Sequence, residues 1–137
     1  MKSTIFPLES ILDTLQVHVS ELYEQFPDNV DRTLAERIID LAHLGYLGVK
    51  ENLDPWQFET RKKDIAKLFY AQGNAHNALF QIDQAVENYH AAIQLDPTNP
   101  DVRADYAKCM WYIGDEEKAV HQIKLARRLA PNRGEFD

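Results

Sequence analysis

The sequence predicts an all-α protein built as a helical repeat, an α-α superhelix with an N-terminal helical extension and about six helices in all. Three observations support this prediction. Apolar residues near the N-terminus recur at spacings of three and four, which is the period of an amphipathic helix. A short pattern recurs at an offset of 34 residues in the C-terminal half, which is typical of stacked helix pairs. Prolines preceded by Asp or Asn stand where helices should begin.

The 137 residues are the size of one domain, and their composition is that of a globular chain. Hydrophobic residues make up 45% and charged residues 27%, unlike the composition of disordered chains. We therefore expect a single domain over residues 1–137, with an N-terminal helical extension (1–54), a repeat region (55–133) and a short tail (134–137).

The first helix is predicted from Pro7 to Phe26. Its apolar residues lie on one face at helical spacing. They are Leu8, Ile11, Leu12, Leu15, Val19, Leu22 and Phe26.

The second helix is predicted to follow a break at residues 27–29, with Asp31 as its N-cap. Its apolar residues lie on more than one face, which indicates a central position. Gly45 and Gly48 lower helix propensity by about 1 kcal/mol each. We expect either close helix contacts at these glycines or an earlier end of the helix.

The third helix is predicted to begin at Asp54, with Pro55 at its first position, and to run on into the repeat region.

The repeat is defined by Pro97 and Pro131, which lie 34 residues apart. Proline ends a helix because it lacks an amide hydrogen and clashes with the preceding turn. Further matches at the same offset pair Ala85 with Ala119, Val86 with Val120, Tyr89 with Ile123, Ala92 with Ala126, and Leu95 with Leu129.

These two copies, at about residues 66–99 and 100–133, resemble the tetratricopeptide repeat, a helix-turn-helix unit. The first copy reads Phe69-x2-Gln72-Gly73-x2-His76, Ala85-x3-Tyr89, Pro97. The second reads Arg103-x2-Tyr106-Ala107-x2-Met110, Ala119-x3-Ile123, Pro131, with Gly114-Asp115 at the turn. It departs from the family pattern at the aromatic and glycine positions.

The resemblance implies that the first helix of each pair lines a concave surface where partner peptides bind. The candidate groove residues are Lys67, Tyr70, Asn74, Asn77, Asp101, Ala104, Lys108 and Trp111. Two alternatives are that these residues form a solvated helical face, or that the N-terminal helices cover them. Acidic residues at Asp101 and Asp105 argue against binding the C-terminal carboxylate of chaperones, the ligand of some relatives.

The last helix offers a second candidate surface, because a repeat array must cover its final apolar face. Val120, Ile123 and Lys124 are the candidate residues of a self-association edge, so a homodimer is one possible assembly. The alternative is that the apolar residues point inward and the cations complement the helix dipole.

The net charge of −7, with its acidic excess in the first 99 residues, disfavours nucleic acid and anionic membranes as partners. No apolar run is long enough to span a membrane. The single cysteine, Cys109, is compatible with a reducing compartment. We therefore expect a cytoplasmic protein whose partner is a protein or peptide.

Catalysis has little support, because the five histidines lack metal-ligand spacing and no nucleophile or phosphate-loop motif is present. We expect no enzyme activity, metal or cofactor. The preferred hypothesis is a scaffold that binds a partner's helix or peptide in its concave face. The alternative is a secretion chaperone, because the size, acidity and architecture are similar to those of class II type III secretion chaperones.

Overall fold

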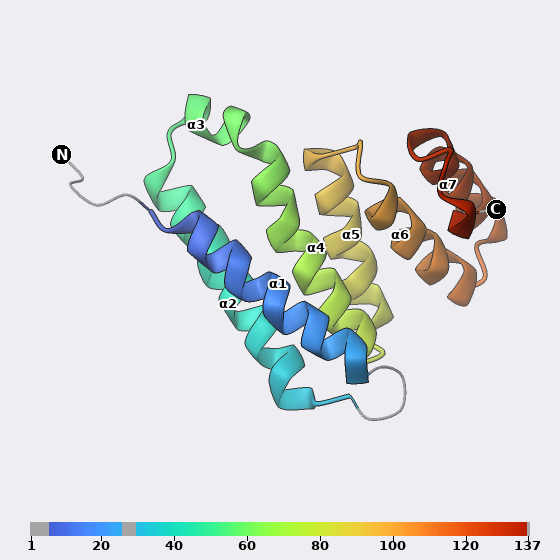
Figure 1. Ribbon diagram of the computed structural model, residues 1–137, viewed down its shortest axis with the longest axis horizontal. Helices are drawn as coiled ribbons and strands as arrows, with labels where there is room; N and C mark the ends of the chain where they lie inside the picture. The colour runs from blue at the N-terminus through green and yellow to red at the C-terminus, as the bar shows by residue number, and fades with distance from the viewer. Residues whose placement is uncertain (1–5, 26–29, 137) are drawn as a thin grey trace.

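A computed structural model describes residues 6–25 and 30–136, and every regular element in these ranges is a helix (Figure 1). The elements are α1 (Leu8–Gln25), α2 (Arg32–Asn52), α3 (Pro55–Thr60), α4 (Lys62–Ala78), α5 (Ile82–Leu95), α6 (Pro100–Tyr112), α7 (Glu116–Leu129) and the 3-10 turn η1 (Gly134–Phe136). The all-α prediction is confirmed.

The helices form three antiparallel pairs that follow one another from the N-terminus to the C-terminus. In Figure 1, α1, α4 and α6 run in one direction, and α2 and α5 run back between them. Each of α2, α4, α5 and α6 contacts the next of the long helices, and α1 contacts both α2 and α4. The predicted N-terminal extension is therefore a helix pair, α1 and α2, stacked ahead of the two repeats.

Helix α1 forms as its apolar spacing predicts. Leu8, Leu15 and Leu22 are buried in a core cluster with residues of α2 and α4. The predicted apolar residue Phe26 lies outside the described residues. The heptad spacing of the three leucines keeps them on one line of the helix, which faces the core.

Helix α2 is capped as predicted, since the Asp31 carboxylate accepts hydrogen bonds from the amides of the first turn. The helix continues through both glycines, so the expectation of close contacts holds. A Cβ atom at Gly45 would lie 3.1 Å from Leu68 and 3.3 Å from Ile11, and one at Gly48 would overlap the ring of Phe6.

The structure differs from the predicted helix count at Arg61. The chain turns there, so the expected third helix is divided into α3 and α4, and the described residues contain seven α-helices rather than six. The Arg61 amide donates to the carbonyls of both Gln57 and Phe58, a tightened turn that ends α3. Its side chain then donates to Asp64, in the first turn of α4.

The second repeat begins and both repeats end as predicted, whereas the first helix of the first repeat begins at Lys62, before the predicted start at about 66. Asn99 caps α6 through its side chain, with Pro100 at the first position. Helices α5 and α7 each end two residues before a proline. The small residue Gly73 permits close packing, because a Cβ there would lie only 2.6 Å from the ring of Tyr89.

Candidate protein-binding site

A groove of about 500 Å³ runs between α1 and α4 and reaches the start of α6. Two helices that run in the same direction form its walls. Residues that line it include Leu12, Leu15, Gln16, Val19 and Tyr23 from α1, Lys67, Tyr70 and Asn74 from α4, and Asn99. The groove therefore combines an apolar floor with amide, hydroxyl and ammonium groups.

The α1 wall is the part that sequence reasoning missed. Leu12 and Val19 are half-buried, and Tyr23 is 51% exposed. One predicted alternative has the N-terminal helices cover the groove residues, whereas α1 supplies one wall and leaves the volume between the walls open. A signal was present, because the apolar stripe of α1 is wide enough to contact two neighbours.

The α4 wall contains three of the predicted residues, brought together one helical turn apart. Lys67 is exposed, and its ammonium group lies 3.6 Å from the Asp64 carboxylate. Asn74 is only 5% exposed, and its carbonyl accepts a hydrogen bond of 2.8 Å from the buried Tyr89 hydroxyl. Lys67 and Tyr70 can change partners on binding, whereas Asn74 also holds the repeat together.

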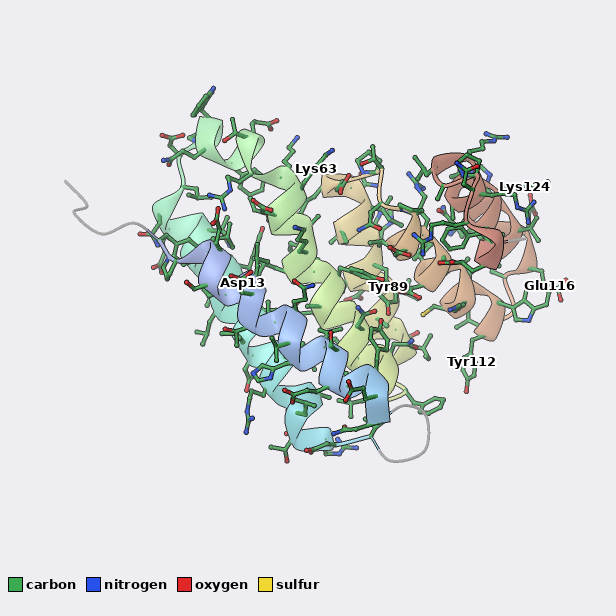
Figure 2. All side chains as sticks on the ribbon, viewed as in Figure 1. Asp13, Lys63, Tyr89, Tyr112, Glu116 and Lys124 are labelled. Carbon is green, nitrogen blue, oxygen red and sulfur yellow. The ribbon has the colours of Figure 1, made fainter. Side chains whose placement is uncertain are left out.

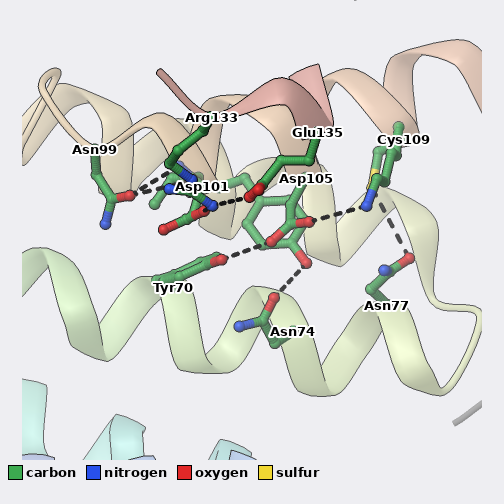
Figure 3. Close-up of polar contacts among 12 residues, drawn as sticks. Tyr70, Asn74, Asn77, Asn99, Asp101, Asp105, Cys109, Arg133 and Glu135 are labelled. Atoms are coloured by element: carbon green, nitrogen blue, oxygen red, sulfur yellow. Dashed lines mark hydrogen bonds and ion pairs between the residues drawn. The ribbon is translucent and has the colours of Figure 1, made fainter. Parts of the chain in front are cut away.

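A polar chain links this wall to α6, as Figure 3 shows. The Tyr70 hydroxyl donates to Asp105 at 2.6 Å, and the Lys108 ammonium group lies 3.8 Å from the same carboxyl group. Burial raises the pKa of Asp105, although the hydrogen bond from Tyr70 and the charge of Lys108 oppose the shift. Burial, and then the charge of Asp105, raise the pKa of Tyr70, so its hydroxyl stays a donor at neutral pH.

Asn77 lies near the C-terminal end of α4, in contact with α6. Its carbonyl oxygen is 3.9 Å from the Cys109 sulfur (Figure 3). Burial, and then the nearby Asp105, raise the pKa of the Cys109 thiol to about 11, so the thiol is protonated and a poor nucleophile at neutral pH. The pair joins α4 to α6, and neither residue lines the groove between α1 and α4.

The structure places two other predicted groove residues beside the tail. The Asp101 carboxylate lies 2.6 Å from the Arg133 guanidinium group, which also pairs with Glu135. Ala104 is buried against Ala126 and Phe136, which corrects its prediction as a groove residue. The reason is that the tail folds back over the start of α6.

Lys108 and Trp111 line a second groove, of about 370 Å³, between α6 and α7. The same groove contains Val120, Ile123 and Lys124, the residues predicted for a self-association edge. The structure thus separates the predicted concave residues into two groups and joins one of them to the C-terminal edge. Figure 2 shows Lys124 on α7 at this edge.

The described residues contain no cluster of three or more His, Cys, Asp or Glu side chains placed to hold a metal ion. Among the same residues, no helix combines the length and apolar character needed to cross a bilayer.

Comparisons with known proteins agree with this geometry. A family model described as tetratricopeptide repeat matches residues 69–136. A search of curated proteins found no match.

Solved structures with a similar fold include a translocator chaperone of type III secretion and a related complex. SycD of Yersinia enterocolitica matches with a TM-score of 0.56 and 22% identity, covering 100% of this chain and 90% of that one. A second SycD structure, an alternative dimer, matches with a TM-score of 0.56 and 20% identity over 90% of this chain and 81% of that one. PcrH, solved with the chaperone binding region of PopB, matches with a TM-score of 0.54 and 19% identity, covering 91% of this chain and 87% of that one.

Proposed function

The chain belongs to the tetratricopeptide repeat family over residues 69–136, and from this premise we propose that it is a non-catalytic module that binds a segment of a partner protein between α1 and α4. The observation that supports this function is the open groove of about 500 Å³ with an apolar floor and a polar rim.

An extended segment fits this groove better than a small charged metabolite. Leu12 and Val19 offer apolar contact for alternate side chains of a peptide. Gln16 can pair with its backbone as donor and acceptor, and Asn99 as a donor, because the Asn99 side-chain oxygen caps α6. Affinity would come from a few anchors and from excluded water, as at other protein interfaces.

The charges at the rim indicate the character of the segment. Glu9 and Asp13 line the groove from α1, whereas Lys67 lies opposite them and beside Asp64. A segment with apolar anchors and a cationic residue near Glu9 and Asp13 would match this arrangement.

A photo-crosslinking experiment tests the proposal. A photoreactive residue placed at Gln16, inside the groove, should crosslink to a defined segment of the partner, and one placed at His43, exposed on α2, should not. The identified segment is then made as a peptide and titrated. Tyr23→Ala should weaken its binding about 10-fold, because aromatic anchors contribute strongly to interfaces. Equal crosslinking at both positions, or unchanged affinity in Tyr23→Ala, would contradict the proposal.

A second candidate function is that of a secretion chaperone that holds a client before export. It is favoured by the fold shared with SycD and PcrH along at least 90% of this chain. Co-expression with a candidate translocator from the same genome tests it. The chain should keep the client soluble, and Tyr23→Ala should return the client to the pellet. For either function we propose the cytoplasm, a reducing compartment in which the buried thiol of Cys109 would persist.

A further inference from the structure

The groove between α6 and α7 in the second repeat corresponds to a surface formed by α4 and α5 in the first repeat. In the first repeat this surface is covered by α6. It is lined by Ala107, Trp111, Ala119, Val120 and Ile123. The residues 34 positions earlier are Gly73, Asn77, Ala85, Val86 and Tyr89. These earlier residues belong to α4 and α5, and they form the surface on which α6 lies.

The way α6 packs on the earlier surface, formed by α4 and α5, shows what kind of element fits the later surface, the groove between α6 and α7. Tyr89 and Ala85 share a core cluster with Tyr106 and Cys109 of α6, and Val86 packs against it. The Cys109 sulfur contacts Asn77 at 3.9 Å. The occupant of the earlier surface is therefore one helix, packed against both helices of the preceding pair.

The tail supplies the first turn of such a helix on the later surface. Gly134–Phe136 lies 34 positions after the start of α6, and Phe136 corresponds to the buried Val102. Phe136 is itself buried against Ala104 and Ala126. Beyond this turn the groove is open, since Val120 is 45% exposed and Trp111 is 60% exposed.

The charge of the groove specifies the chemistry of the occupant. Asn74 and His90 of the first repeat correspond to Lys108 and Lys124 of the second, 34 positions later. The groove between α6 and α7 therefore has lysines where the first repeat has an amide and an imidazole. Lys108, Lys124 and Arg127 are exposed at the edge of an otherwise apolar lining, and the Lys108 ammonium group also lies 3.8 Å from the Asp105 carboxyl group. A helix with acidic residues beside its apolar stripe would satisfy both features.

We propose that the groove between α6 and α7 binds an acidic amphipathic helix of a partner protein, seated on the second repeat beyond the tail, where the later turns of α6 are seated on the first. The site is separate from the groove between α1 and α4. The chain would then bring two protein segments together, one at each surface.

Two synthetic peptides based on residues 99–114 serve as probes, both with Cys109→Ser to prevent oxidation. The acidic peptide carries Arg103→Glu and Lys108→Glu, and the basic peptide carries Asp101→Lys and Asp105→Lys. Each is labelled with fluorescein and titrated with the full chain by anisotropy. The acidic peptide should bind saturably, and the basic peptide at least 10-fold more weakly.

Variants of the chain locate the binding. Val120→Glu should abolish binding of the acidic peptide, and Lys124→Glu should weaken it several-fold. Both residues are exposed, so circular dichroism should show an unchanged fold. The matched control is Val17→Glu, on the exposed side of α1, which should bind like the wild-type chain.

Three outcomes would overturn the proposal. The first is no saturable binding of the acidic peptide to the wild-type chain, and the second is binding that Val120→Glu leaves unchanged. The third is a dimer in light scattering that Val120→Glu converts to a folded monomer, because a second copy would then occupy the groove. None of these outcomes affects the crosslinking at Gln16, so failure here is distinguishable from failure of the groove between α1 and α4.

Discussion

At the scale of single residues, Phe80 and Gly114 form a matched pair. They lie 34 positions apart in the turns that join the helices of each repeat, and both have positive φ angles, 58° and 90°. Glycine adopts this region without penalty, whereas a residue with a Cβ is strained by roughly 1–2 kcal/mol. The Phe80 ring gains little in return, because it is 67% exposed.

Replacing these two residues should therefore have opposite effects. Phe80→Gly should raise the free energy of unfolding by about 0.5–1 kcal/mol, since the relieved strain exceeds the added entropy of the unfolded chain. Gly114→Ala should lower it by about 1 kcal/mol, because no neighbouring atom lies within 4 Å to compensate the strain. Urea unfolding measures both values. A loss of stability in Phe80→Gly would show that the contact of its ring with Tyr112 outweighs the strain.

Asp105 is the residue at which pH should alter stability. Its folded pKa is raised by burial, so folding favours the protonated carboxyl group. The corresponding stability is fully present below the unfolded pKa, about 3.9, and is lost as the pH rises through the raised folded pKa. Above that pH, the ionised carboxylate is a net cost to the folded state.

Asp105→Asn should remove this pH-dependent contribution. The amide oxygen still accepts the Tyr70 hydroxyl hydrogen, and no charge has to be buried at any pH. The stability of the variant relative to the wild type should therefore increase with pH above about 3.9 and level off above the folded pKa. Urea unfolding at a series of pH values measures the difference. A variant that is less stable at pH 8, with a difference independent of pH, would contradict the assignment.

At the scale of elements, local chemistry predicted helix starts well. Asp31, Asp54 and Asn99 each cap a helix as expected, because the side chain and the following amides lie within one turn. The break at Arg61 could not be predicted, since no proline or glycine marks it. The chain makes a tightened turn there, and Arg61 also forms an ion pair with Glu9 of α1, which is distant in sequence.

The tail is an element whose role was also missed. Residues 134–137 are predicted only as a short tail, yet Phe136 is buried and its carbonyl accepts two hydrogen bonds from Arg127. The 34-residue repeat period indicates that Phe136 is buried, because Phe136 lies 34 residues after the buried Val102.

Phe136→Ala should destabilise the chain by about 2 kcal/mol. This is less than the about 3–5 kcal/mol typical of an enclosed phenylalanine, because the tail can adjust to the missing ring. Glu135→Ala, an exposed change in the same turn, is the control and should alter stability by less than about 0.5 kcal/mol. Thermal and urea unfolding of the two variants give the comparison. Equal stability of Phe136→Ala and Glu135→Ala would mean that the tail does not hold α7.

At the scale of the whole molecule, the stacking of the helices determines which residues line each candidate groove. The repeat pattern predicts Lys67, Tyr70 and Asn74 as groove residues, and in the structure these three residues line one wall of a groove. It could not place α1 opposite them, because that contact depends on how a helix pair without the repeat pattern packs onto α4. It also could not show that Lys108 and Trp111 line a different groove, whose other residues come mainly from α7.

The same stacking makes α4 the centre of the molecule. It contributes buried residues to the core cluster that it shares with α1 and α2, and Phe69 and Tyr70 also pack against the cluster built from α5 and α6. Helix α7 buries only Ala119 and Ala126, and it contacts mainly α6 and the tail. Local opening should therefore require the most free energy in α4 and much less in α7.

Amide hydrogen exchange of the folded chain tests this order. Amides in the middle of α4 should be protected at least 10-fold more than those in the middle of α7, a difference of about 1.4 kcal/mol in opening free energy. Binding of the acidic helical peptide between α6 and α7 should then reduce the difference in protection between α4 and α7, because only the groove of α7 gains contacts. Equal protection in α4 and α7 without peptide would show instead that the three helix pairs open as one unit, and α4 would have no special role in holding them together.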